Sequence, residues 1–126
     1  MRIVIAGAGE VGTHLATLLT RDKHDIVLIT EDEQTYNSAC SREDLLKVSG
    51  CPTSISFLKE SGVDQCKLFV AVTPDESRNM TSCMLAKKLG AEITVARVDT
   101  MEYMEEENQQ FFRDKGISSL IYPELL

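Results

Sequence analysis

The sequence lacks a long apolar run. No segment approaches the roughly 18 uninterrupted apolar residues that a membrane span requires. The first residues also lack the basic region and the apolar stretch of a secretory signal peptide. We therefore expect a cytoplasmic protein that does not insert into the membrane itself.

Clusters of basic residues are also absent. The 13 lysines and arginines are scattered among 20 acidic residues, which gives a formal net charge of −7. A protein that binds the phosphate backbone of a nucleic acid gathers Lys and Arg on one surface. The charge pattern therefore argues against nucleic acid as a partner.

The four cysteines do not form a metal-binding pattern. Cys40, Cys51, Cys66 and Cys83 lie far apart, with no C-x-x-C pair and no pair of histidines close by. Structural zinc sites bring their ligands at short, fixed spacings. We expect no metal site, and reduced, mostly buried thiols in a reducing compartment. Cys51 has no basic neighbour in the sequence that would mark it as a nucleophile.

What the sequence does contain begins with its first twelve residues. Residues 2–6 are a short apolar run rich in β-branched side chains, typical of a strand buried on both faces of a parallel sheet. Gly7, Gly9 and Gly12 follow at G-x-G-x-x-G spacing, before an apolar-periodic segment. Gly7 permits a tight turn, Gly9 lets a phosphate approach the backbone, and Gly12 lets a helix pack close to the sheet. The helix start would offer N–H groups and a positive dipole end to an anion.

The rest of the chain repeats this alternation of strand and helix within a single domain of 126 residues, a length that supports a hydrophobic core. Further strands are expected at 26–29, 45–49, 68–72, 93–98 and 119–122. Helices are expected at 11–19, 32–39, 54–60, 73–89 and from about 101 to 115, the last one broken near 107–108. Short connections between these elements predict βαβ units. We expect an α/β fold with three layers, a Rossmann-like doubly wound sheet of six parallel strands.

In such a sheet the ligand binds where the strands end, near the reversal of strand order. The second strand ends at Thr30, followed by Glu31 and Asp32. A dinucleotide site usually has an acid about 20 residues beyond the glycines, which accepts hydrogen bonds from ribose hydroxyls. Asp32 fits that role or the role of a helix N-cap. No Arg follows directly to receive a 2′-phosphate, which disfavours NADP.

Three other strand ends supply candidate residues. Cys51 and Pro52 follow the third strand and are slim enough to lie against an adenine, and Thr73 would face the ligand from the fourth. Pro74 would stand in the first turn of the next helix. Arg97 ends the fifth strand, where its guanidinium could donate to a phosphate or a ribose.

Two charged residues allow a structural interpretation instead. Arg97 could form an ion pair with Glu10, Asp75 or Glu124. Glu10 lies inside the glycine loop, where an acid beside a phosphate would be repulsive. We expect the Glu10 side chain to point outward and to complement the helix N-terminus.

Five blocks of sequence, taken together, resemble a known family. They are residues 7–12, 24–32, 71–79, 96–98 and 121–124. The chain is similar over 1–126 to the TrkA N-terminal domain, also called the RCK or KTN domain. This is a cytosolic nucleotide-binding regulator of potassium transporters and channels. Family members continue into a further regulatory domain, so we expect this chain to be the N-terminal part of a longer protein.

The resemblance implies binding of NAD(H), or in some members ATP or ADP. On matching positions, the implied contacts are Gly7, Ala8, Gly9, Glu10, Val11, Cys51, Pro52, Thr73, Pro74 and Arg97. Thr30 and Cys51 stand where the family usually has Asp. Thr30 removes the usual carboxylate anchor for the ribose, which leaves Asp32, matching the second acid of the family's I-D-x-D, as a compensating anchor.

The resemblance also implies a homo-oligomer, a dimer or larger, attached to an integral-membrane potassium transporter at the inner face of the plasma membrane. Independently, helix 75–89 is apolar around most of its circumference, so more than its sheet-facing side must be covered. Its apolar residues, and those of the following helix, are Met80, Cys83, Met84, Leu85, Ala86, Leu89, Met101, Tyr103, Met104, Phe111 and Phe112.

We expect a regulator and not an enzyme. An NAD-dependent dehydrogenase needs an acid or base beside its substrate, and neither His14 nor His24 has a plausible site around it. A dimerising scaffold with a weakened nucleotide site at Thr30 is a third interpretation.

Overall fold

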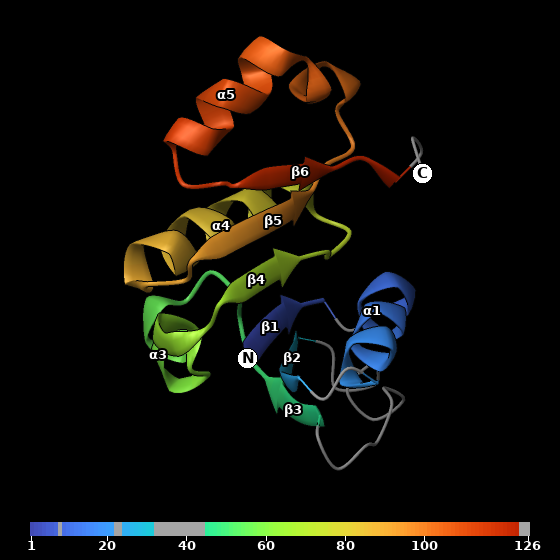
Figure 1. Ribbon diagram of the computed structural model, residues 1–126, viewed down its shortest axis with the longest axis vertical. Helices are drawn as coiled ribbons and strands as arrows, with labels where there is room; N and C mark the ends of the chain where they lie inside the picture. Colours follow the sequence, from blue (N-terminus) through green and yellow to red (C-terminus); the bar gives the residue numbers. More distant parts are fainter. Residues whose placement is uncertain (8, 22–23, 32–44, 124–126) are drawn as a thin grey trace.

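The computed structural model describes residues 1–7, 9–21, 24–31 and 45–123. Its six strands form one parallel sheet in the order β3-β2-β1-β4-β5-β6 (Figure 1). They are β1 (Arg2–Ala6), β2 (Asp25–Thr30), β3 (Leu45–Ser49), β4 (Leu68–Ala71), β5 (Ile93–Arg97) and β6 (Ser119–Ile121). This confirms the expected Rossmann-like order, with its reversal between β1 and β4.

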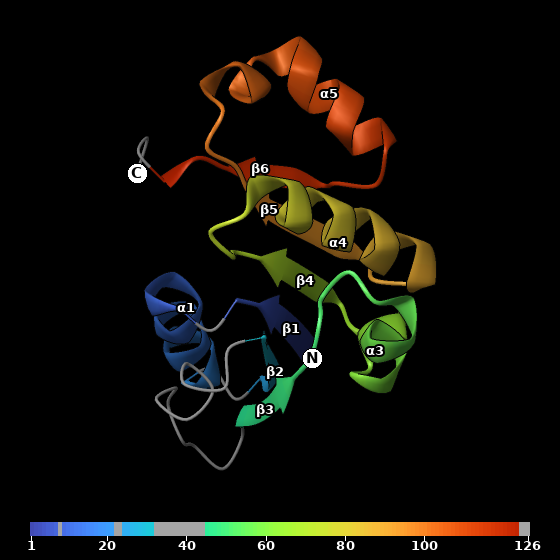
Figure 2. The same cartoon turned by 180° about the vertical axis from the view of Figure 1, so that it is seen from behind.

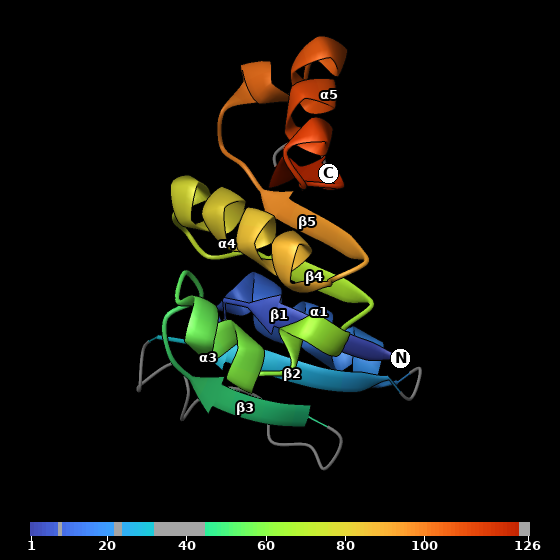
Figure 3. The same cartoon turned by 90° about the vertical axis from the view of Figure 1, so that its left-hand side faces the viewer.

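Helices cover both faces of the sheet. They are α1 (Glu10–Thr20), α3 (Ile55–Glu60), α4 (Glu76–Leu89) and α5 (Glu106–Asp114), with short 3₁₀ turns η1 (Val63–Gln65) and η2 (Met101–Met104). Helix α1 lies on one face, and α3 and α4 lie on the other (Figures 1 and 2). Helix α5 lies beyond β6, at the edge of the sheet (Figure 1), and stands at the end of the molecule in the side view of Figure 3. The expected three layers are therefore present.

Each face of the sheet has its own core, because successive side chains of a strand point to opposite faces. Val4, Ala6 and Phe69 belong to the cluster that includes the buried residues of α3 and α4. Ile3 and Ile5 belong to the cluster that includes Ala16 of α1. All of these strand residues are fully buried. Burial on both faces explains why the strands are nearly continuous apolar runs.

The ends of two helices differ from the expectation. Pro74 precedes helix α4 instead of standing in its first turn. The reason is that the Asp75 carboxylate accepts from the Arg78 N–H at 3.2 Å, which makes Asp75 the N-cap and Glu76 the first helical residue. The last helix is broken at Glu105, whose backbone is extended (φ −65°, ψ 140°), and not near 107–108. The expected helix 32–39, with Asp32 as its cap, lies outside the described residues.

Among the residues that the structure describes, no helix has both the length and the apolar character needed to cross a membrane.

Candidate functional site

A cavity of about 420 Å³ lies where β1, β2 and β4 end, at the reversal of strand order. Its walls come from the glycine loop, the end of β2, the turn after β3 and the start of α4. The lining residues are Gly7, Gly9, Ile29, Thr30, Glu31, Pro52, Thr73, Pro74, Asp75 and Arg78. The volume is in the range of small-molecule and cofactor sites.

The three glycines of the loop are required for different physical reasons. Gly7 has φ +117°, and a Cβ there would approach the Thr73 backbone nitrogen to 2.9 Å. A Cβ on Gly12 would overlap the carbonyl oxygen of Gly7. Gly9 differs from both, because nothing lies within 4 Å of the position of its Cβ. Gly7 and Gly12 therefore allow backbone segments to approach each other, whereas Gly9 opens onto the cavity.

Gly9 is also the N-cap of α1. Glycine has no side chain with which to cap a helix, and the first N–H groups of a helix have no partners within it. The start of α1 therefore presents backbone donors and the positive end of its dipole at the cavity, an arrangement that suits an anion.

The end of β2 supplies Thr30 and Glu31, as the sequence predicted. Thr30 is buried, with 5% of its surface exposed, and its carbonyl accepts from the Gly50 N–H at 2.8 Å. The Glu31 carboxylate is half-exposed and pairs with the guanidinium of Arg78. Asp32, the alternative ribose anchor, lies outside the described residues, as do Ala8 and the side chain of Glu10.

Arg78 is a residue that the strand-end argument missed. It stands in the first turn of α4, and it reaches Glu31 from 47 positions away in the sequence. The argument from the sequence considered only the residues that directly follow β2, where no Arg stands, and so it did not reach Arg78. The available signal was helical spacing, since Arg78 is three residues after the cap residue Asp75 and so faces the same rim.

Asn79 is a second residue that sequence reasoning missed. It is 1% exposed, and all of its amide hydrogen bonds join strand ends. Its Oδ1 accepts from the backbone N–H and the hydroxyl of Thr73, at 2.9 and 2.6 Å. Its Nδ2 donates to the carbonyls of Thr73 and Arg97, at 2.9 and 3.0 Å. Asn79 therefore holds the end of β4 against the end of β5 and fixes Thr73 at the cavity wall.

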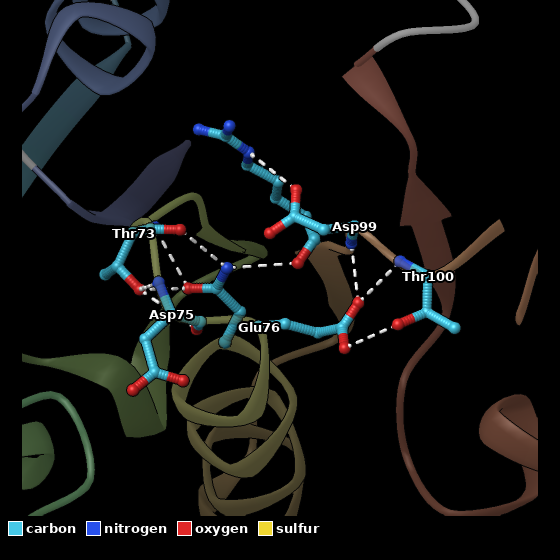
Figure 4. A network of polar contacts seen from close by, with 7 residues as sticks. Thr73, Asp75, Glu76, Asp99 and Thr100 are labelled. Carbon is cyan, nitrogen blue, oxygen red and sulfur yellow. Dashed lines mark hydrogen bonds and ion pairs between the residues drawn. The ribbon is translucent and has the colours of Figure 1, made fainter.

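Glu76 extends this network to the segment that follows β5. Its carboxylate accepts from the Asp99 N–H at 2.6 Å, and from the Thr100 N–H and hydroxyl at 2.8 and 2.9 Å. In Figure 4, Thr73 and Asp75 lie on one side of Glu76, with Asp99 and Thr100 on the other. One turn of α4 thus joins the cavity wall to the approach to η2.

Arg97 lies apart from the cavity. It does not belong to the lining residues, because β4 separates its strand from β1. Its Nε is 3.8 Å from a carboxylate oxygen of Asp99 and, among the described residues, has no hydrogen-bond partner. The described acid beside it is therefore not Asp75, one of the three partners expected from the sequence. The side chains of Glu10 and Glu124, the other two, lie outside the description.

The turn after β3 places Pro52 in the wall but leaves Cys51 out of the lining. The Cys51 Sγ is 3.0 Å from the Thr53 hydroxyl, and this hydrogen bond lowers the pKa of the thiol below its usual value. Burial raises the pKa of Cys66 to about 11 and raises that of Cys83 still further.

Val11 and Gly12, which the sequence placed in the glycine loop, are absent from the lining of the cavity. No cluster of His, Cys, Asp or Glu among the described residues could hold a metal ion.

Comparison with known proteins places this geometry in a family. The model of the TrkA-N domain matches residues 3–123. Two relatives are each named "Trk system potassium uptake protein TrkA homolog". The one from Archaeoglobus fulgidus is 39% identical over 83% of this chain and 24% of its own length. The one from Methanothermobacter thermautotrophicus is 35% identical over 98% of this chain and 55% of its own length. The chain thus spans at most about half of either relative.

Solved structures of similar fold include two of GsuK. GsuK bound to ADP has a TM-score of 0.74 and 25% identity, over 95% of this chain and 30% of that one. The GsuK channel bound to NAD has a TM-score of 0.77 and 18% identity, over 95% of this chain and 21% of that one. The second likeness shows the fold alone. With the glycine loop, the strand order and the family match in agreement, the chain belongs to the TrkA-N domain family.

Proposed function

We propose that this chain is the nucleotide-binding domain of a regulator of Trk-type potassium transport. An adenine nucleotide, NAD(H) or ATP/ADP, would occupy the cavity at the strand ends. Its occupancy would change the affinity of the domain for two arrangements of a transporter, as such regulation requires.

The observation that carries the proposal is the open Gly9 at the start of α1, inside a cavity large enough for a cofactor. A phosphate can approach the Gly9 backbone without meeting a side chain, and the N–H groups of the first turn would bind it. Pro52 and Ile29 provide apolar wall for an adenine, and Thr30 and Thr73 provide hydroxyls near the ribose. In the proposed site Gly7 and Gly12 shape the loop, and Arg97 lies outside the lining of the cavity.

The names of the relatives support potassium transport as the regulated process. The relatives are named as potassium uptake proteins, and the similar GsuK structures are bound to ADP and to NAD. Carried over to this chain, these likenesses favour an adenine nucleotide as ligand and a potassium transporter in the membrane as partner. The domain would then stand at the cytoplasmic face of that transporter, as part of a longer protein.

An oxidoreductase is less well supported. Within the described part of the chain, the titratable side chains that line the cavity are Glu31, Asp75 and Arg78. Glu31 is paired with Arg78, and Asp75 caps α4, so neither carboxylate is placed as a base for hydride-transfer chemistry. Both histidines lie outside the lining.

Self-association is supported by apolar side chains exposed on one side of the domain. Met84 of α4, Met101 of η2 and Phe111 of α5 are 39%, 60% and 55% exposed. Phe112 packs edge-to-face against Tyr103, with ring centroids 5.1 Å apart, and against Phe111. We propose that this side forms the interface between copies of the domain, because exposed apolar groups of this kind are costly in water.

Calorimetric titration with NAD, NADH, ADP and ATP tests the proposal. We expect saturable binding of at least one of them, and binding of none would refute it. Thr30→Asp adds a carboxylate at the usual ribose anchor and should raise NAD affinity by about tenfold, the effect of one charge-assisted hydrogen bond. An unchanged affinity would assign the anchor to Asp32 instead. A chain that dimerises without binding any nucleotide would be the scaffold.

A further inference from the structure

The cavity carries an unbalanced set of charges. Among the residues that the structure describes, its charged lining consists of two acids, Glu31 and Asp75, and one base, Arg78. The guanidinium of Arg78 donates to Glu31, while its backbone N–H donates to Asp75 at 3.2 Å. The positive charge that a phosphate would seek is therefore already engaged by a carboxylate, and a second carboxylate stands beside it.

The pair is positioned to act on a ligand. It joins the end of β2 to the first turn of α4, and all of its members line the same cavity. The width of a 420 Å³ cavity does not exceed the Debye length of about 8 Å at physiological salt, so these charges are close enough to act on a bound phosphate. The Arg78 and Glu31 side chains are 42% and 37% exposed. Pairs of that kind contribute little to stability, so a change of either partner should leave the fold intact.

We propose that the Glu31–Arg78 ion pair selects adenine nucleotides by their charge. With Arg78 held by Glu31, the excess negative charge of the lining disfavours a chain of several phosphates. The glycine loop alone then binds phosphate, which favours a ligand whose charge is confined there, such as the pyrophosphate of a dinucleotide. Arg78 is thus a specificity-determining residue. This inference rests on the proposed binding of an adenine nucleotide in the cavity.

The test uses adenosine, AMP, ADP and ATP, whose negative charge rises with each phosphate, together with NAD. The measured quantity is the ratio of ATP affinity to adenosine affinity. Glu31→Gln releases Arg78 and should raise this ratio by about tenfold. Arg78→Gln leaves two uncompensated acids and should lower it by about tenfold. Arg78→Lys keeps the charge and should stay close to the original protein. The NAD affinity should move less than the ATP affinity in both variants.

A matched pair of control variants exists at the amino ends of the strands, away from the cavity. Arg2 and Asp25, the first residues of β1 and β2, form an ion pair at 3.0 Å with side chains 38% and 56% exposed. Arg2→Gln and Asp25→Asn change the net charge by the same amounts and should leave the ratio unchanged within about twofold. The effects at Glu31 and Arg78 should shrink in about 0.5 M salt, where screening is stronger.

Glu31→Gln and Arg78→Gln must move the ratio of ATP affinity to adenosine affinity in opposite directions. Changes in the same direction, or equal changes for adenosine and ATP, would overturn the proposal and leave the pair a structural contact. Loss of a ribose contact at Glu31 would weaken adenosine and ATP equally, so it does not affect the ratio. Failure of the original protein to bind any nucleotide would refute the proposed function itself, whereas binding with an unaltered ratio would refute only the charge selection.

Discussion

Helices α1 and α4 both begin at the rim of the cavity, and they begin in different ways. The N-cap of α1 is Gly9, which has no side chain and opens onto the cavity. The N-cap of α4 is Asp75, whose carboxylate accepts from the Arg78 N–H at 3.2 Å. Beside it, the amide of Asn79 binds Thr73 and the end of β5. One helix start is open, and the other is satisfied within the protein.

The difference assigns a role to each helix. The donors at the start of α1 are available to an anion, so a phosphate belongs there. At the start of α4 the capping carboxylate of Asp75 already accepts from the backbone of its own helix. This helix contributes side chains instead, with Arg78 at the cavity and with Glu76 and Asn79 at the end of β5. The predictions below change the backbone packing, the hydrogen bonds and the charges at these two helix starts.

The largest effect is expected from Gly12→Ala. The added Cβ would overlap the Gly7 carbonyl, and neither backbone segment can move without displacing α1 from the sheet. We expect a loss of at least about 3 kcal/mol in the free energy of unfolding, measured with chemical denaturant. A variant as stable as the original protein would show that α1 does not require the close approach.

Asn79→Ala comes next. It removes four hydrogen bonds, so the backbone N–H and carbonyl of Thr73 lose their amide partner, whereas the Thr73 hydroxyl keeps its contacts with the Asp75 backbone. A loss of about 2–3 kcal/mol in the free energy of unfolding is expected. Asn108→Ala is a control, because the Asn108 amide also donates to a carbonyl but this hydrogen bond is exposed to solvent. Equal effects at the two positions would contradict a special role for the α4 network.

Gly9→Ala separates binding from stability. The backbone there (φ −75°, ψ −165°) suits alanine, and its Cβ would meet no protein atom within 4 Å. The methyl group would instead occupy the space of the bound phosphate. We expect at least a tenfold loss of nucleotide affinity by calorimetry, equivalent to about 1.4 kcal/mol. The melting temperature should fall only slightly, because alanine is a poorer N-cap than glycine. Unchanged affinity would mean that no phosphate lies over Gly9.

These expectations also show what the sequence could reveal. The fold was predictable because its signals lie in short stretches of sequence. Each strand buried on both faces is a run of a few apolar residues, and the three glycines of the loop lie within six positions. Thr30, Pro52 and Thr73 line the cavity as expected, since parallel strands end at one edge. Arg78 and Asn79 were missed because their partners lie on other strands, which only the folded chain brings together. Arg97 was expected near the ligand because it ends a strand, but it lies outside the lining, because β4 separates its strand from β1.

Asp75→Ala should cost about 1 kcal/mol, because the N-cap of α4 loses its acceptor. The melting temperature should fall by about 4 °C for a domain of this size. Asp75→Asn keeps a capping oxygen while removing the charge, so it should retain most of the stability. If both variants were equally destabilised, the charge of Asp75 and not its cap would matter.

The smallest effect concerns thiol reactivity at the turn after β3. The pKa of Cys51 is lowered by its hydrogen bond to Thr53, whereas burial raises the pKa of Cys66 to about 11. Near pH 7.5 a larger fraction of Cys51 is therefore thiolate, so iodoacetamide should label it ahead of Cys66 and Cys83, as located by peptide mass spectrometry. Bound nucleotide should slow this labelling by a few-fold, because Pro52 next to it lines the cavity. Faster labelling of Cys66 would contradict the burial seen at that position.

The most direct test compares the backbone amides at the two helix starts during a nucleotide titration followed by NMR. We predict that ADP or NAD shifts the amide signals of residues 9–12, at the start of α1, far more than those of residues 77–79, at the start of α4. The largest shifts at 77–79, with residues 9–12 unmoved, would contradict the assignment of the phosphate to the open helix.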